Sequence, residues 1–106
     1  MPKYLFEAHY SAEGAKAILK DGGTARREAV GKAIAGIGGR MEAFYFAFGG
    51  TDVYVLAELP DNVTAAAMAL AVSQSGLAST TTRVLLTPEE VDQAAKKPLN
   101  YRPPGG

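Results

Sequence analysis

The sequence predicts a single α+β domain built on a four-stranded antiparallel sheet, and three observations lead to this prediction. Residues 44–59 hold two runs of aromatic and aliphatic residues on either side of a Gly-Gly-Thr-Asp turn, which is typical of a β-hairpin. Residues 3–10 and 77–86 have the composition of two further strands. Segments with helical spacing separate the strands, so the order is β-α-β-β-α-β with one additional C-terminal helix, which is the ferredoxin-like unit.

The first half of the chain is expected to hold one strand and two helices. Residues 3–10 alternate and are rich in aromatic residues, which favours a strand. Ser11 is expected to cap a helix whose apolar face is Ala12, Ala15, Ile18 and Leu19. Thr24 is expected to cap a second helix, whose apolar face is Ala29, Val30, Ala33, Ile34 and Ile37. Glycines at 36, 38 and 39 would end this helix, because a helix end often needs a left-handed residue.

The second half is expected to hold three strands and two helices. The strands are predicted at 40–48, 53–59 and 78–87, and the helix between the last two at about 62–74. Thr87-Pro88-Glu89-Glu90 is a capping box with proline at the first helical position, so it marks the start of the last helix. The domain is therefore predicted to span residues 1–97, with 98–106 as an extended tail.

The composition excludes several classes of function. Eleven basic residues balance eleven acidic ones without a basic run, so we expect no nucleic-acid or membrane partner. There is no cysteine, hence no disulfide, thiolate nucleophile or Cys-type zinc site, and a single histidine makes a weak metal site. No signal-peptide pattern precedes the first strand. The expected location is the cytoplasm; no metal is predicted, and the cofactor is left unknown.

Self-association is predicted because helices can cover only one face of such a sheet. Right-handed crossovers would place both helical layers on the same face. The other face would still carry apolar and aromatic residues, although the alternation of the second strand is ambiguous. A large exposed apolar face usually marks an interface. A second copy of the chain is the simplest cover, so the predicted partner is the chain itself, in a homodimer or a higher oligomer.

A polar patch is predicted on that second face. Two-residue alternation places Glu7 and His9 on one side of the first strand, and Tyr54 and Glu58 on one side of the third. Arg83 of the last strand could neutralise one carboxylate and leave the other with a raised pKa, beside a histidine that could exchange protons. These five residues are the candidate ligand-binding site. The alternative is a Glu–Arg pair that only fixes the register of a dimer.

A second candidate site lies at the start of the second helix. Gly23 and Thr24 precede Arg27 there, and the N–H groups and dipole of a helix N-terminus favour an anion. The alternative is an ordinary turn between two helices. Ser11, His9 and Asp52 could be written as a Ser-His-Asp set, but their spacing does not support it.

Three segments of the chain resemble the GYD family of small bacterial proteins. They are GGTARREAV at 22–30, AFYFAFG followed by DVYV and LPDN at 43–62, and VLLTPEEVDQA at 84–94. The resemblance covers roughly residues 2–104 and implies a dimeric α/β barrel, but it carries no established activity. The family's Gly-Tyr-Asp triplet is Gly50-Thr51-Asp52 here, so no role of that tyrosine hydroxyl transfers.

Two classes of function follow from these observations. The first is a homo-oligomer that binds a small, partly apolar molecule in the inter-sheet or sheet–helix space; whether it is an enzyme is left open. The second is a non-catalytic assembly, regulatory or ligand-sensing module. An RNA-binding sheet is disfavoured, because residues 41–59 contain no lysine or arginine.

Overall fold

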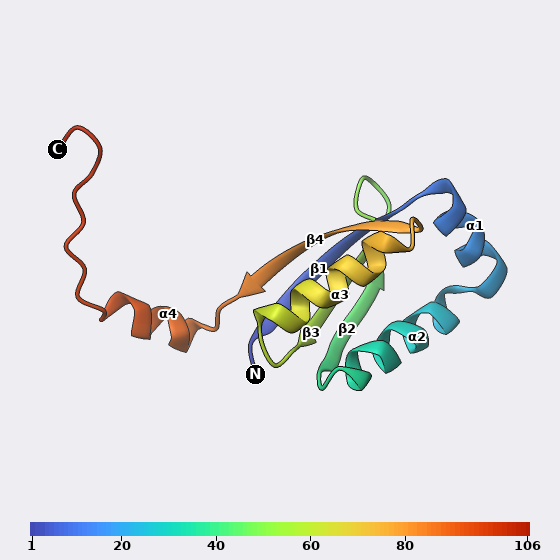
Figure 1. Ribbon diagram of the computed structural model, residues 1–106, viewed down its shortest axis with the longest axis horizontal. Helices are drawn as coiled ribbons and strands as arrows, with labels where there is room; N and C mark the ends of the chain where they lie inside the picture. Colours follow the sequence, from blue (N-terminus) through green and yellow to red (C-terminus); the bar gives the residue numbers. More distant parts are fainter.

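The computed structural model describes residues 1–106 and shows a mixed α+β protein with four strands and four helices (Figure 1). In chain order the elements are β1 (Lys3–Tyr10), α1 (Ala12–Asp21), α2 (Gly23–Gly36), β2 (Arg40–Phe46), β3 (Val53–Glu58), α3 (Asn62–Gln74), β4 (Ala78–Leu85) and α4 (Pro88–Ala95). The predicted order of elements is confirmed. Strands β2, β3 and β4 end one or two residues earlier than expected. None of the helices has the length and apolar character needed to cross a membrane.

The four strands form one antiparallel sheet in the order β2-β3-β1-β4, so β1 and β3 lie at its centre. This order is compatible with the predicted ferredoxin-like arrangement. Helix α2 packs on β2 and helix α3 on β4, which places the two helices over opposite sides of the same sheet face. The central strands are therefore covered by side chains that reach in from both helices.

The core lies between this face of the sheet and the helices. Alternate residues of β1 and β3 point into it, and they meet one buried residue from each of α2 and α3. The core cluster is Tyr4, Phe6, Ile34, Val53, Val55, Ala57, Leu59 and Ala65. The hydroxyl of Tyr4 donates a hydrogen bond to Asn62 Oδ1 at 2.6 Å, which joins β1 to the first residue of α3.

The opposite face of the sheet, which no helix covers, is called the open face. It carries the alternate residues of all four strands: Lys3, Leu5, Glu7 and His9 of β1, Tyr54, Leu56 and Glu58 of β3, Arg40, Ala43 and Tyr45 of β2, and Ser79, Thr81, Arg83 and Leu85 of β4. Tyr45 is 71% exposed and Tyr54 is 38% exposed in the single chain.

A β-bulge at Glu42 explains why simple alternation could not orient β2. Met41 pairs with Ala57 and Phe44 with Val55, so both residues face the helices although they are three positions apart. The extra residue between Met41 and Ala43 shifts the pattern by one. Glu42 therefore joins the open face, where its carboxylate meets Lys3 and Arg40.

The helix starts follow the sequence with one correction. Ser11 caps α1 by accepting the Gly14 N–H at 3.2 Å. Thr24 does not cap α2, because that helix begins one residue earlier, at Gly23. Its N-cap is Gly22, which makes no side-chain hydrogen bond and has φ +87°. A glycine fits this position because other residues adopt positive φ at a steric cost.

The chain after β4 projects away from the body of the protein (Figure 1). This segment, residues 86–106, is called the C-terminal arm and contains α4 followed by residues without helix or strand. Every residue from Pro88 to Gly106 is exposed. The arm is held at its base by the predicted capping box: the Glu90 N–H donates to the Thr87 hydroxyl at 3.1 Å, and the Thr87 N–H donates to the Glu90 carboxylate at 3.0 Å.

Candidate functional site

The five ligand-binding candidates all lie on the open face, but they take part in three separate polar contacts. Glu7 is opposite Tyr54 of β3 in the register, and Arg83 is opposite Leu5 on the other side of β1. Arg83 reaches across to Glu7, and its Nε donates to Oε2 at 2.7 Å. The hydrogen bond and charge of Glu7 raise the pKa of the Arg83 guanidinium.

Glu58 belongs to a second group, with Lys3, Arg40 and Glu42. Its Oε1 lies 3.2 Å from Lys3 Nζ and 3.0 Å from Arg40 Nη2, and both cations also contact Glu42. A hydrogen bond with Glu42, followed by those from Lys3 and Arg40, lowers the pKa of the Glu58 carboxyl from 4.5 to about 2. This group therefore joins the ends of three neighbouring strands.

His9 belongs to a third group, with Asp52. Its Nδ1 lies 3.0 Å from Asp52 Oδ2, which also accepts the Tyr10 N–H at 2.8 Å. The Asp52 N–H in turn donates to the Ala8 carbonyl at 2.8 Å. Ser11 takes no part, because its hydroxyl donates to the Leu77 carbonyl at 3.2 Å and caps α1. A histidine–aspartate pair is present, but its partners attach the β2–β3 loop to the end of β1.

The main pockets of the protein contain none of the five open-face candidates. No group of three or more His, Cys, Asp or Glu residues is arranged to hold a metal ion. In a single chain the open face therefore offers paired charges beside exposed tyrosines. A shared ligand site for these residues stays a prediction, and it requires a second surface to enclose it.

The three anion-site candidates lie together beside β2. Gly23, Thr24 and Arg27 line a pocket of about 260 Å³ with Phe44 and Phe46. The N-terminus of α2 lies at this pocket, but Arg27 is exposed to solvent. The anion site stays a prediction.

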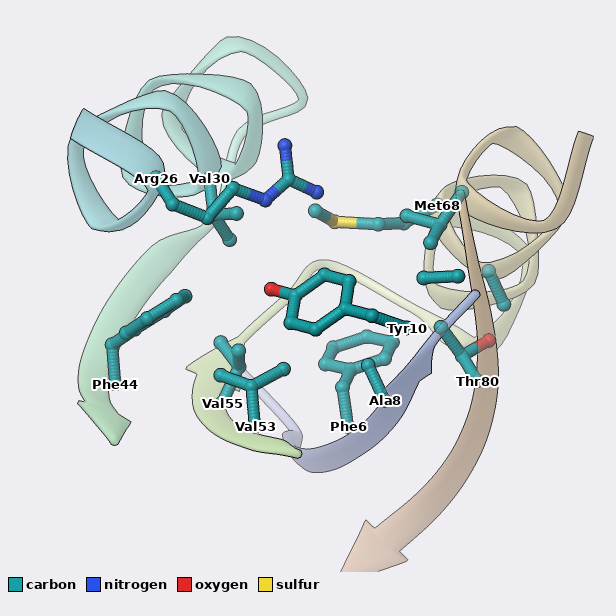
Figure 2. Close-up of a pocket in the computed structure, with 13 residues that line it drawn as sticks. Phe6, Ala8, Tyr10, Arg26, Val30, Phe44, Val53, Val55, Met68 and Thr80 are labelled. Carbon is teal, nitrogen blue, oxygen red and sulfur yellow. The ribbon is translucent and has the colours of Figure 1, made fainter. Parts of the chain in front are cut away.

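A different, apolar cavity lies inside the sheet–helix layer (Figure 2). Its volume is about 40 Å³, which is room for a few water-sized groups. Eleven of the thirteen lining residues are hydrophobic, and they come from all four strands and from α2 and α3. The ring of Tyr10 lies in the middle of the cavity, with Phe44 on one side and Met68 on the other.

The cavity continues outward into a groove between α2 and α3. This groove has a volume of about 380 Å³ and shares four lining residues with the cavity: Arg26, Val30, Met68 and Val72. The rest of its wall is formed mainly by alanines of the two helices. Because α2 and α3 cover opposite sides of the sheet, the groove lies directly above the central strands.

Arg26 is the one charged residue that lines the cavity. Its side chain extends from α2 toward Met68 of α3, above the ring of Tyr10 (Figure 2). The Nε atom of Arg26 is buried and has no hydrogen-bond partner. A buried guanidinium N–H without an acceptor is unfavourable, since such groups normally pair with a carboxylate, phosphate or carbonyl oxygen.

The sequence prediction chose the neighbouring arginine. Arg26 precedes Val30 by four residues and the buried Ile34 by eight, so it lies on the inner face of α2. Arg27 lies about one quarter of a turn away and faces outward. The helical spacing from Val30 and Ile34 was the signal that could have identified Arg26.

Comparison with known proteins gives one match. A family model described as GYD domain matches residues 4–95 of the 106-residue chain. No curated protein matches the chain, and no solved structure does.

Proposed function

The chain belongs to the GYD domain family, and from this premise we propose that it binds a small, partly apolar anion between the sheet and helices α2 and α3. The observation that carries the proposal is the buried, unpaired Nε of Arg26 at the wall of an apolar cavity. A carboxylate placed there would accept the unused N–H in a charge-assisted hydrogen bond. The apolar part of the same ligand would contact the aromatic and aliphatic lining.

The size of the site favours a ligand of modest length. The cavity of about 40 Å³ accepts only one end of such a molecule, whereas the adjoining groove of about 380 Å³ has the size of a small-molecule site. The remainder of the ligand would therefore lie in the groove along the alanine-rich walls of α2 and α3. Arg26 lines both spaces, so it is placed to hold the anionic group where they meet.

The lining of the site supports binding more directly than catalysis. Apart from Arg26, Tyr10 is the only cavity residue with a titratable side chain. Its hydroxyl could donate a second hydrogen bond to the ligand. No carboxylate or imidazole lines the cavity to serve as a general base. This favours a ligand-sensing or carrier role for the site, which is the non-catalytic class of function that the sequence also allows.

The proposed assembly is a homodimer of ferredoxin-like protomers in a dimeric α/β barrel, located in the cytoplasm. The strand order β2-β3-β1-β4, the single helical face and the exposed tyrosines of the open face support it. The Glu7–Arg83 pair and the Glu58 group leave few unpaired charges on that face. A face whose charges are paired within one chain can be covered at a lower desolvation cost.

Ligand binding is tested by titrating the protein with straight-chain carboxylates of four to ten carbons and with the alcohols of equal length, by calorimetry. We expect the carboxylates to bind more tightly than the alcohols. Arg26→Gln should weaken carboxylate binding about 10-fold or more, because a hydrogen bond to a charged group contributes about 1.5–3 kcal/mol.

Arg27→Gln is the matched control, since it removes the same charge from the next position of the same helix and should leave the affinity unchanged. Equal binding of acid and alcohol, or equal affinity of Arg26→Gln and the native chain, would contradict the proposed site. Each variant is first compared with the native chain by circular dichroism, which excludes a loss of folding as the cause.

A further inference from the structure

We infer that the C-terminal arm of each chain packs on the open face of a second copy of this chain, in a reciprocal two-fold exchange. This inference extends the proposed homo-oligomer and does not depend on ligand binding at Arg26. Its starting point is that an ordered helix, α4, projects from the body with all of its residues exposed (Figure 1).

The direction of the arm is fixed by local interactions at its base. The reciprocal hydrogen bonds of Thr87 and Glu90 set the first turn of α4, and Pro88 restricts φ at the first helical position. Only Leu86 and Thr87 connect β4 to α4. A connection this short, held by a capping box, does not let the helix turn back onto its own sheet without losing the cap. The surface that covers the arm must therefore come from outside the chain.

The arm carries apolar side chains that water does not favour. Leu86 is 60% exposed, Val91 52%, Leu99 85% and Tyr101 69%. Scattered single apolar residues on a surface need no explanation. Four in a segment that buries no residue at all are different, because the arm has no core of its own to order it.

The surface area of the single chain points the same way. Its accessible surface is 7367 Å², whereas a compact monomer of 11.1 kDa is expected to have about 5,700 Å². Its radius of gyration is 16.9 Å, compared with about 13 Å for a compact domain of this length. The excess is larger than the roughly 800 Å² that each partner buries in a standard interface.

A second copy is the occupant that these observations favour, because the same chain carries both halves of the contact. The open face has exposed Tyr45 and Tyr54 beside the half-buried Leu5 and Leu56. The arm contains three acidic and three basic side chains, so it is neutral overall and would not be repelled by a face with paired charges. A two-fold exchange would cover both arms and both faces and would close the assembly.

The first test is analytical ultracentrifugation of the full chain and of matched variants in the arm. Val91→Glu should raise the dissociation constant of the dimer at least 10-fold. Gln93→Glu adds the same side chain to the opposite side of α4 and should have little effect. A full chain that remains a monomer at 100 µM would overturn both the arm exchange and the proposed oligomer. A chain shortened to residues 1–87 that dimerises as tightly as the full chain would overturn the arm exchange alone.

The second test asks where the arm lies. The chain has no cysteine, so Val91→Cys and Tyr45→Cys can be introduced together and treated with a short bis-maleimide. Arm exchange predicts that the two introduced cysteines link different chains, which gives a covalent dimer on a denaturing gel. Val91→Cys combined with Leu19→Cys, on the exposed side of α1, should not cross-link. A link within one chain, or no link between the cysteines introduced at positions 91 and 45, would overturn the inferred position of the arm.

Discussion

Asp52 holds the β2–β3 loop to the end of β1 through one carboxylate. It accepts the Tyr10 N–H and contacts the His9 ring, and its own N–H donates to Ala8. The preceding Gly50 has φ +94°, so the first and last residues of the Gly50-Thr51-Asp52 triplet each have a conformational or hydrogen-bonding role. The middle residue has no hydrogen bond of this kind, which is consistent with threonine in the place of the family's tyrosine.

Asp52→Ala should therefore lower the free energy of unfolding by about 1–3 kcal/mol, because the Tyr10 N–H loses its charged acceptor. Urea denaturation measures this change. Thr51→Ala, at the adjacent position of the same loop, should change the stability by less than about 0.5 kcal/mol. Similar losses in the two variants would mean that the loop, and not the carboxylate, is responsible.

Glu58 should give the stability of the protein a measurable acid dependence. Its carboxyl has a pKa of about 2 in the folded chain and 4.5 as its ordinary value. The folded state therefore favours the charged form, so the contribution of Glu58 is complete above about pH 4.5 and is lost as the pH falls toward 2. Thermal unfolding between pH 2 and 6 should show a smaller fall in Tm for Glu58→Gln than for the native chain. Parallel curves for the two proteins would contradict this assignment.

At the scale of elements, capping and periodicity predicted most of the secondary structure, and close backbone approaches were not visible in the sequence. The boundaries of α3 and the start of α4 agree with the sequence, since Asp61 and Thr87 cap them. The predicted face of α1 is partly wrong, because Leu19 is 87% exposed and Gly14 is the buried residue. A β-carbon on Gly14 would lie 2.0 Å from the Leu77 carbonyl oxygen, so α1 and the start of β4 approach each other through a glycine.

Gly14→Ala should destabilise the protein by about 1–3 kcal/mol, because the added methyl group forces α1 away from Leu77. Gly36→Ala is the matched control, since a β-carbon at the last residue of α2 meets no atom within 4 Å. It should be neutral or stabilising by up to about 1 kcal/mol. Chemical denaturation of the two variants measures both effects. A Gly14→Ala chain as stable as Gly36→Ala would show that α1 moves without cost.

At the scale of the whole molecule, the proposed self-association predicts a clear difference between two leucines. Leu56→Arg adds an unpaired charge at the centre of the open face and should shift the protein toward the monomer by at least 10-fold in dissociation constant. Leu70→Arg, at a 71% exposed position of α3, should not. Sedimentation equilibrium distinguishes the two outcomes. Equal behaviour of both variants would mean that the open face is not the contact.

The sequence predicted the architecture of the molecule better than its cavity. Alternation correctly placed Glu7, Tyr54 and Arg83 on one face, because strand period alone decides the side of a sheet. The cavity depends on how far apart two helices lie above that sheet. That separation is set by the side chains of both helices together, so no single segment encodes it. Arg26 therefore became a candidate only when α3 and Met68 were seen opposite it.

The bulge in β2 also affects how this protein meets its own kind at high concentration. An edge strand with a regular row of free N–H and C=O groups can add strands from other molecules and start a fibril. The extra residue at Glu42 interrupts that row in β2, and charged Arg40 lies beside it. The other edge, β4, presents a run of serine, threonines and arginine in place of an apolar strand. Both borders of the sheet thus resist amyloid-like growth, while its open face remains free for specific assembly.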